Sequence, residues 1–170
     1  MNMSPEAQEV QHEFESCKLK AYPDPKTGGK PWTCGWGCTG EDSFGNAIDE
    51  STEWTQEQAD HEHAVKLAYF EDLVRQNVTV ELTQGVFDCM VDIIFNVGPG
   101  TRDSAANDWH GRDGIITLRS GKPSTLLRKL NEGDFAGAKD SYDDWVSPGS
   151  NVEKGLRRRR KAFLDRFWDM

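Results

Sequence analysis

The sequence lacks several features that would assign a protein to a class at once. No apolar run approaches the roughly 18 residues of a membrane-spanning helix, so no transmembrane helix is expected. The first residues are polar and acidic, without the basic and then apolar regions of a secretory signal. Internal repeats and low-complexity stretches are absent from the sequence as well. What is left is an ordinary globular chain of 170 residues, long enough to bury one good core.

Cysteine and histidine are scarce and scattered. The four cysteines form no C-x2-C pair, and the four histidines are too dispersed to predict a zinc site. We therefore expect neither a metal nor another cofactor. Without a visible secretory signal, the cysteines are expected to be free, buried thiols.

Positive charge is also in short supply. The chain has 20 Lys and Arg against 29 Asp and Glu, and the net charge of −9 argues against a nucleic-acid partner. Most of the cations lie after residue 100, so the first hundred residues are strongly acidic. An acidic surface does not attract an anionic polymer from a distance, so we expect substrate binding to depend on a shaped groove.

Local signals predict a mainly helical chain with a small β region. Thr55–Gln58 has the form of a capping box, and Thr83 stands where a helix N-cap is expected. Apolar residues cover most faces of residues 84–97, which predicts a buried central helix. Between residues 18 and 54, Pro and Gly turns separate short alternating runs that are typical of antiparallel strands.

Together these elements predict a single α+β domain over residues 1–170. A β lobe is expected at about 18–54, a connecting helix at about 55–76, and a helical lobe at about 77–170 that also includes the N-terminal helix. Residues 99–123 are polar and contain several glycines. A connection of this length is unusual inside a compact domain and is often functional.

The stretch from Glu15 to Gly37 carries the candidate chemistry. Glu15 falls in the last turn of the first predicted helix, where the helix C-terminus and an apolar neighbourhood both disfavour a negative charge and suit it to donate a proton. Asp24 lies between two prolines in a polar place and suits a general base, and the hydroxyl of Thr33 could hold a water against it. Two carboxyl groups in different environments are what cleavage of a glycosidic bond needs. Taken singly, each acid is better explained without chemistry, Glu15 as an exposed helix residue and Asp24 as a turn-forming residue.

Two other features leave alternatives open. Trp32 and Trp36 are four apart and are predicted to share one strand face, where their rings either stack on sugars or fill a hairpin core. Five consecutive cations, Arg157 to Lys161, lie in the last predicted helix. Because consecutive helical positions point in all directions, some of these arginines must face inward and need a carboxylate partner, for which Glu15 and Asp24 are candidates.

The sequence resembles the phage-type lysozymes, the endolysins of glycoside hydrolase family 24 that include the lysozyme of T-even phages. The likeness covers nearly the whole chain apart from residues 99–123, and its blocks occur in the family's order. These blocks are Glu15, Asp24 and Thr33 within PWTCGWG, then FNVG at 95–98, STLLRKLN at 124–131, Trp145, and GLRRRR at 155–160.

The resemblance implies a lysozyme-like α+β fold with a cleft between a small β lobe and a larger helical lobe. It implies hydrolysis, with inversion, of the β-1,4 bond between N-acetylmuramic acid and N-acetylglucosamine in peptidoglycan. In that reaction Glu15 is the general acid, Asp24 the carboxylate that acts on the attacking water, and Thr33 its helper.

The resemblance also implies residues that bind the glycan. Phe95, Asn96 and Ser124 match positions that line the family's groove. An arginine of the last helix, either Arg157 or Arg160, is expected to pair with the catalytic Glu. The implied partner is the glycan strands of peptidoglycan, with no nucleic acid and no stable membrane association. The protein is expected to be a monomer, made in the host cytoplasm and acting on the periplasmic cell wall after release.

Three other functions remain open at this stage. A lytic transglycosylase uses one acid/base Glu and needs neither Asp24 nor Thr33. A non-catalytic peptidoglycan-binding module on the same fold would be expected to lose the catalytic carboxylates. A secreted antibacterial effector would share the catalysis but not the route to the wall.

Besides a gap between Asp24 and Thr33 that is longer than in the shortest members of the family, the sequence departs from the family pattern at two places. Cys38 follows the GWG turn, where a His is common. The insertion at 99–123 is the second departure, and we hypothesise that it is a lid or a wall-contact element with Trp109 and His110 at its tip. The alternative is a surface excursion that the fold tolerates.

Overall fold

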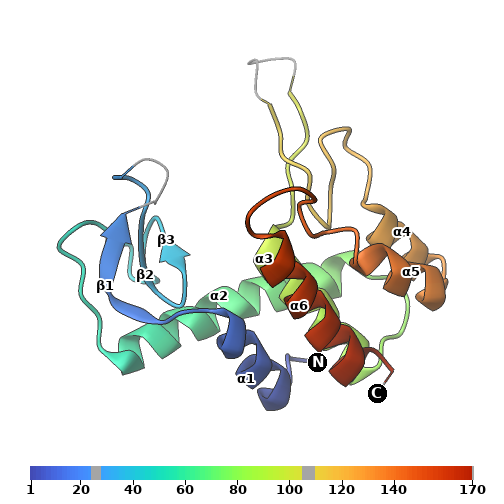
Figure 1. Cartoon of the computed structure of the whole chain (residues 1–170), viewed down its shortest axis with the longest axis horizontal. Helices are drawn as coiled ribbons and strands as arrows, with labels where there is room; N and C mark the ends of the chain where they lie inside the picture. Colours follow the sequence, from blue (N-terminus) through green and yellow to red (C-terminus); the bar gives the residue numbers. More distant parts are fainter. Residues whose placement is uncertain (24–27, 105–109, 170) are drawn as a thin grey trace. The chain divides into compact units, whose positions relative to one another are not determined.

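The computed structural model describes residues 1–23, 28–104 and 110–169. The chain divides into two compact units, which are called here the helical unit, Met1–Ala7 with Phe70–Met170, and the β unit, Gln8–Tyr69. In chain order the elements (Figure 1) are α1 Pro5–Phe14, β1 Lys18–Pro23, β2 Trp32–Gly35, β3 Cys38–Thr39, α2 Gln56–Asn77, α3 Gln84–Val97, α4 Thr125–Asn131, α5 Phe135–Tyr142, α6 Glu153–Phe163 and the π-helix η1 Leu164–Trp168.

The predicted caps form and set the helix starts. The backbone N–H of Gln58 donates to Thr55 Oγ1 at 3.1 Å, and the N–H of Thr55 donates back to Gln58 Oε1 at 2.8 Å. This reciprocal pair is the predicted capping box, and it begins α2. Thr83 accepts from the N–H of Val86 at 3.3 Å at the start of α3, also as predicted.

The β unit has a three-stranded antiparallel sheet in the order β1-β2-β3. In its register Tyr22 of β1 lies opposite Thr33 of β2, and Cys34 lies opposite Cys38 of β3. The sheet packs on α2 through a small apolar cluster, with Trp32 and Trp36 partly buried against it. The buried members of the cluster are Ala21, Cys34, Cys38, Ile48, Trp54 and Ala59.

One prediction about the sheet is wrong. Strand β2 ends at Gly35, which has φ 60°, so Trp36 lies in the turn beyond it and does not share a strand face with Trp32. A Cβ on Gly35 would stand 2.9 Å from a ring carbon of Trp54. Both the left-handed backbone and this close approach require glycine here, and together they turn the chain before Trp36.

Helix α3 is the central element of the helical unit. It is buried continuously from Gly85 to Ile94, as its apolar sequence predicts. Two carboxylates, Asp88 and Asp92, lie inside this buried stretch. The last predicted helix also forms, and its final turns continue as the π-helix η1, which packs against α3.

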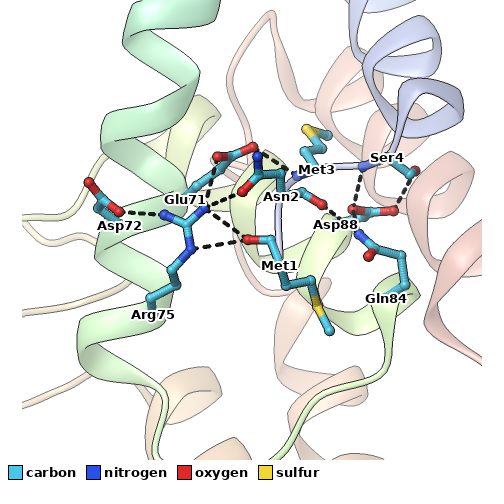
Figure 2. A network of polar contacts seen from close by, with 9 residues as sticks. All are labelled: Met1, Asn2, Met3, Ser4, Glu71, Asp72, Arg75, Gln84 and Asp88. Carbon is cyan, nitrogen blue, oxygen red and sulfur yellow. Dashed lines mark hydrogen bonds and ion pairs between the residues drawn. The ribbon is translucent and has the colours of Figure 1, made fainter.

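The first four residues are fastened to the helical unit by a polar network (Figure 2). The N–H of Met3 donates to Glu71 on α2 at 2.8 Å, and the guanidinium of Arg75 donates to the carbonyl of Met1 at 2.8 and 3.0 Å. The N–H and hydroxyl of Ser4 both donate to the carboxylate of Asp88 on α3, at 2.9 and 2.6 Å. This network ties the start of the chain to α2 and α3 at once.

The described part of the predicted insertion belongs to the helical unit (Figure 1). Thr101 and Arg112 pair as an antiparallel bridge, with backbone bonds of 2.7 and 2.8 Å. Gly100 and Gly114 lie just outside this bridge, and a Cβ on Gly114 would clash with the backbone nitrogen of Gly100. The two segments can approach this closely only because glycine stands at this position. Trp109, at the predicted tip, lies outside the described residues, and the lid hypothesis stays a prediction.

Of the residues that the structure describes, none belong to a helix both long and apolar enough to cross a membrane.

Candidate active site

Glu15 stands at the point where α1 meets the turn that follows β2. Its N–H donates to the carbonyl of Gln11 at 3.2 Å, so it continues the last helical turn, and its side chain is half-buried. A Cβ on Gly37 would lie 4.0 Å from Glu15 Oε2, which places the carboxylate against the turn. The predicted setting of Glu15, at a helix end and partly covered, is confirmed.

Thr33 lies in the same β unit, half-buried in the middle strand of the sheet. It pairs with Tyr22 on one side and Thr39 on the other. Its neighbour Trp32 pairs with Pro23, the last residue of β1. Asp24 follows Pro23 in the sequence but lies outside the described residues, so its predicted partnership with Thr33 remains a prediction.

An aromatic stack beside Glu15 was not predicted from the sequence. The ring of His12 lies flat on Trp36, with centroids 3.9 Å apart and an interplanar angle of 7°. A second imidazole, that of the buried His63, has its ring centroid 4.7 Å from the ring centroid of His12. Trp36 Nε1 donates to Asp60 Oδ1 at 2.7 Å, which fixes the indole from its other end. The stack therefore holds the turn against which the Glu15 carboxylate lies.

The stack also sets the local electrostatics. Burial lowers the pKa of His12, although the charges of Asp60 and Glu15 act in the opposite direction. The hydrogen bond from Trp36 lowers the pKa of Asp60, and a further bond from Gln56 adds to this effect. These shifts favour the neutral form of His12 and the ionised form of Asp60. The only sequence signal for this cluster is that His12 precedes Glu15 by one helical turn.

The predicted glycan-binding residues lie in the helical unit, in three different settings. Phe95 is half-buried, with its ring 5.3 Å from that of Phe70 in an edge-on arrangement. Asn96 Oδ1 accepts from Arg160 Nη2 at 2.6 Å. Ser124 is fully buried and caps α4, a role that accounts for this side chain without a ligand. The part of all three in binding remains a prediction.

The run of arginines is divided between surface and interior, as helical geometry requires. Arg159 is buried and bonds the carboxylate of Asp92, with its shortest contact at 2.7 Å. The prediction that an inward arginine needs a carboxylate holds for Arg159, and Asp92 is a partner that the sequence did not indicate. It does not hold for the buried Arg160, which donates to the carbonyl of Trp145 and to Asn96 Oδ1. Arg157 is exposed and bonds Glu153, while Arg160 is buried. The pairing of Arg157 or Arg160 with the catalytic Glu remains a prediction.

Comparison with known proteins identifies the family. Residues 12–162 match the phage lysozyme family. The chain belongs to this family. It is 30% identical over 147 residues to the endolysin of Salmonella phage P22, covering 86% of this chain and 85% of that one. It is 29% identical over 153 residues to the endolysin of Acyrthosiphon pisum secondary endosymbiont phage 1, covering 88% and 86%.

Solved structures agree with this assignment. A crystal structure of a P22 lysozyme mutant superposes with a TM-score of 0.68 at 28% identity, covering 96% of this chain and 99% of that one. The muramidase domain of SpmX from Asticaccaulis excentricus gives a TM-score of 0.71 at 26% identity, covering 98% and 97%. The predicted fold class, a mainly helical α+β lysozyme with a small sheet, is confirmed.

Proposed function

We propose that this phage lysozyme is an endolysin muramidase that hydrolyses the β-1,4 bond between N-acetylmuramic acid and N-acetylglucosamine in peptidoglycan. The observation that carries the proposal is the family match over residues 12–162, a range that includes Glu15 and Thr33, both of which lie in the β unit. A half-buried carboxyl at a helix end suits proton donation, and a hydroxyl on the central strand suits the orientation of a water.

The roles divide between two carboxyl groups. Glu15 gives its proton to the glycosidic oxygen as that bond breaks, so the leaving sugar departs as an alcohol. Asp24 takes a proton from the water that attacks the anomeric carbon, and Thr33 orients this water. A water must fit between the two groups, so inverting enzymes hold their carboxyls about 6.5–9.5 Å apart. Phe95, Asn96 and Ser124 are proposed to contact the glycan.

The proposed partner is the glycan strand of the wall, which a monomer is sufficient to bind. The protein would be made in the host cytoplasm and would reach the periplasmic wall after release. The endolysins among the relatives support action on the cell wall. A lytic transglycosylase is not favoured, since that chemistry leaves Asp24 and Thr33 without a role.

Product chemistry tests the proposal. Purified peptidoglycan is digested, and the fragments are analysed by mass spectrometry and by NMR of the newly formed anomeric centre. We expect reducing-end N-acetylmuramic acid that appears first as the α anomer. The β anomer would contradict inversion, 1,6-anhydro ends would establish a transglycosylase, and the absence of fragments would favour a binding module.

The role of Asp24 is tested separately. Asp24→Asn keeps the shape of the side chain but removes the base, so we expect activity to fall by about 10²–10⁴-fold. Asp140→Asn, at an exposed position of α5, is the matched control and should retain wild-type activity. Equal activity of the two variants would remove Asp24 from the mechanism.

A further inference from the structure

The β unit has a pocket that takes no part in the proposed reaction. Its volume is about 400 Å³, and its walls come from the loop after β3, the segment before α2 and the first turns of α2. All its lining residues lie within 42–62, so the pocket belongs to the β unit alone. Neither Glu15 nor Thr33 lines it. Phe44 does, and the site is called here the Phe44 pocket.

Phe44 presents an apolar ring to solvent. The residue is 78% exposed. The imidazole of His61 on α2 stacks beside the ring, with centroids 5.9 Å apart and an interplanar angle of 19°. A single exposed apolar residue is common on protein surfaces, so the exposure alone indicates nothing. The way in which the loop holds the ring is more informative.

The loop that carries Phe44 is fixed from within and from α2. The carboxylate of Asp42 accepts from the N–H of Phe44 at 3.0 Å and from the N–H of Asn46 at 2.8 Å. The N–H and the hydroxyl of Ser43 donate to the carboxylate of Glu62 at 2.8 and 2.6 Å. Glu62 is a buried residue of α2, so these bonds fasten the loop to the helix. The ring is therefore preorganised, which lowers the entropic cost of binding a ligand.

A donor and an acceptor lie in the same lining as the ring. Glu57 and Gln58 are both exposed there. The amide oxygen of Gln58 accepts from the N–H of Thr55 in the capping box, which fixes this side chain and makes its amide nitrogen a donor. Glu57 supplies acceptor oxygens. This combination matches a sugar, whose C–H face packs on an aromatic ring while its hydroxyl and acetamido groups donate and accept hydrogen bonds.

The charges of the lining argue against other ligands. Asp42, Glu57 and Glu62 are acids, and among the described residues that line the pocket none is a lysine or an arginine. Such a lining repels a phosphate, a nucleic acid or an anionic membrane surface. It also differs from the core of a protein interface, where charged residues are depleted. Asp42 and Glu62 already accept hydrogen bonds from the loop, so they are committed to the fold and do not form a cation site with Glu57.

Exposed apolar groups continue along α2 beyond the pocket. Val65 and Tyr69 follow His61 by four and eight residues and are 45% and 54% exposed. Positions four apart lie on the same side of a helix, and eight residues rise by about 12 Å. Tyr69 thus adds an exposed ring at a distance of a few sugar units, which favours a chain of sugars over a single one.

We propose that the Phe44 pocket is an accessory site that binds the glycan chain of peptidoglycan through its N-acetylated amino sugars, apart from the residues that cleave the chain. The inference rests on the proposed function for the identity of the polymer. The backbone of this glycan is neutral and rich in hydroxyl groups, as the lining requires. A second contact with the polymer raises the effective concentration of substrate at the catalytic residues.

Direct binding tests the site without catalysis. A chitin tetramer, which is a chain of N-acetylglucosamine, is titrated into the whole protein, and the imidazole signals of His61 are followed by NMR. We expect saturable shifts, with binding at this site weakened about tenfold in Phe44→Ala because the stacking surface is lost. Absence of saturable shifts would overturn the proposal.

Two further variants control for effects on folding. Phe44→Tyr keeps a ring at this position and should bind the tetramer as wild type does. Val152→Ala removes an exposed apolar side chain of the helical unit and should also leave binding unchanged. Equal binding by Phe44→Ala and Val152→Ala would remove the ring from the site and overturn the proposal.

Other occupants would give different results. A cation site would bind a glucosamine tetramer, which is deacetylated and positively charged, much more tightly than the chitin tetramer and would lose this preference in Glu57→Gln. We expect no such preference, and finding it would overturn the assignment to acetylated sugars. Cosedimentation with phosphatidylcholine vesicles that depends on Phe44 would also overturn it, because the ring would then serve a membrane.

Kinetics separate this proposal from the proposed function. We expect Phe44→Ala to raise KM on intact peptidoglycan several-fold and to change kcat less, because the ring touches no reacting atom. Cleavage with the same KM in wild type and Phe44→Ala would overturn the accessory site and leave the muramidase intact. Saturable chitin binding that depends on Phe44, without cleavage of peptidoglycan, would support the site and overturn the muramidase.

Discussion

The two units of this protein handle charge differently. The helical unit buries Asp88, Asp92 and Arg159, each at most 3% exposed, and gives each of them hydrogen-bond partners. The β unit also buries Glu62, which is bonded by Ser43, but its core cluster consists of Ala, Cys, Ile and Trp side chains. Its candidate proton donor, Glu15, is only half-buried.

The difference reflects two uses of a carboxylate. A buried acid with fixed partners organises packing, and it cannot exchange its proton without a large cost. An acid that reacts must meet its substrate and change its protonation state, so it needs an accessible place with rigid surroundings. In this chain those surroundings are the stack of His12 on Trp36, which is aromatic and not ionic.

Breaking the buried ion pair should give the largest change in stability. Removing one partner leaves the other charge buried and unpaired, so we expect Asp92→Leu or Arg159→Met to lower the free energy of unfolding by about 3–5 kcal/mol. The double variant should recover much of this loss, because it leaves no orphan charge. Urea unfolding of the four proteins gives the coupling energy. If the loss of stability in the double variant equals the sum of the losses in the two single variants, the pair does not act as a unit.

Disrupting the aromatic stack should have a smaller effect on stability. His12→Ala removes the stacked ring, and we expect it to cost about 1 kcal/mol. It should also make the free energy of unfolding less dependent on pH. Because the folded-state pKa of His12 is lowered, its contribution to stability is complete above the unfolded pKa and is lost as the pH falls through the folded pKa.

The matched control for this prediction is His61→Ala. His61 is exposed, and its ring stacks on that of the exposed Phe44. Urea unfolding measured between pH 8 and pH 5 should therefore show a changed pH dependence of the free energy of unfolding in His12→Ala and not in His61→Ala. If the free energy of unfolding depends on pH in the same way in wild type and in His12→Ala, then His12 does not contribute to the loss of stability at low pH.

The smallest expected effect sharpens the contrast between buried and exposed acids. Burial raises the pKa of Asp88 in the helical unit, whereas the side-chain amide of Asn46 lowers the pKa of Asp42 in the β unit. The contribution of Asp88 to stability is complete below its unfolded pKa and is lost as the pH rises through its folded pKa. That of Asp42 is complete above its unfolded pKa and is lost as the pH falls through its folded pKa. Carboxyl ¹³C NMR titration should find the two groups shifted in opposite directions, and a common direction would contradict the comparison.

The sequence predicts the features that depend on neighbouring residues. The capping box at Thr55, the cap at Thr83 and the end of α1 near Glu15 follow from side chains within one helical turn of each other. The inward arginine also follows, since helical geometry forces part of any consecutive run to face the core. These predictions hold because the interactions that decide them are local.

The features that escape prediction depend on contacts distant in the sequence. Asp92 and Arg159 are 67 residues apart, and nothing in either segment specifies the other. Trp36 lies in the turn after β2 and not in the predicted strand, and the glycine before it closely approaches Trp54 from another part of the β unit. The Phe44 pocket combines the loop after β3 with the first turns of α2, so only the folded chain brings its groups together.

The central claim is that Glu15 is the proton donor of a peptidoglycan hydrolase. The most direct test compares the rate at which wild type and Glu15→Gln release reducing ends from purified peptidoglycan, with Glu9→Gln, an exposed acid of the same helix, as the control. We predict a loss of at least about 10²–10⁴-fold for Glu15→Gln alone, with unchanged urea unfolding. Wild-type activity in a folded Glu15→Gln protein would contradict the account.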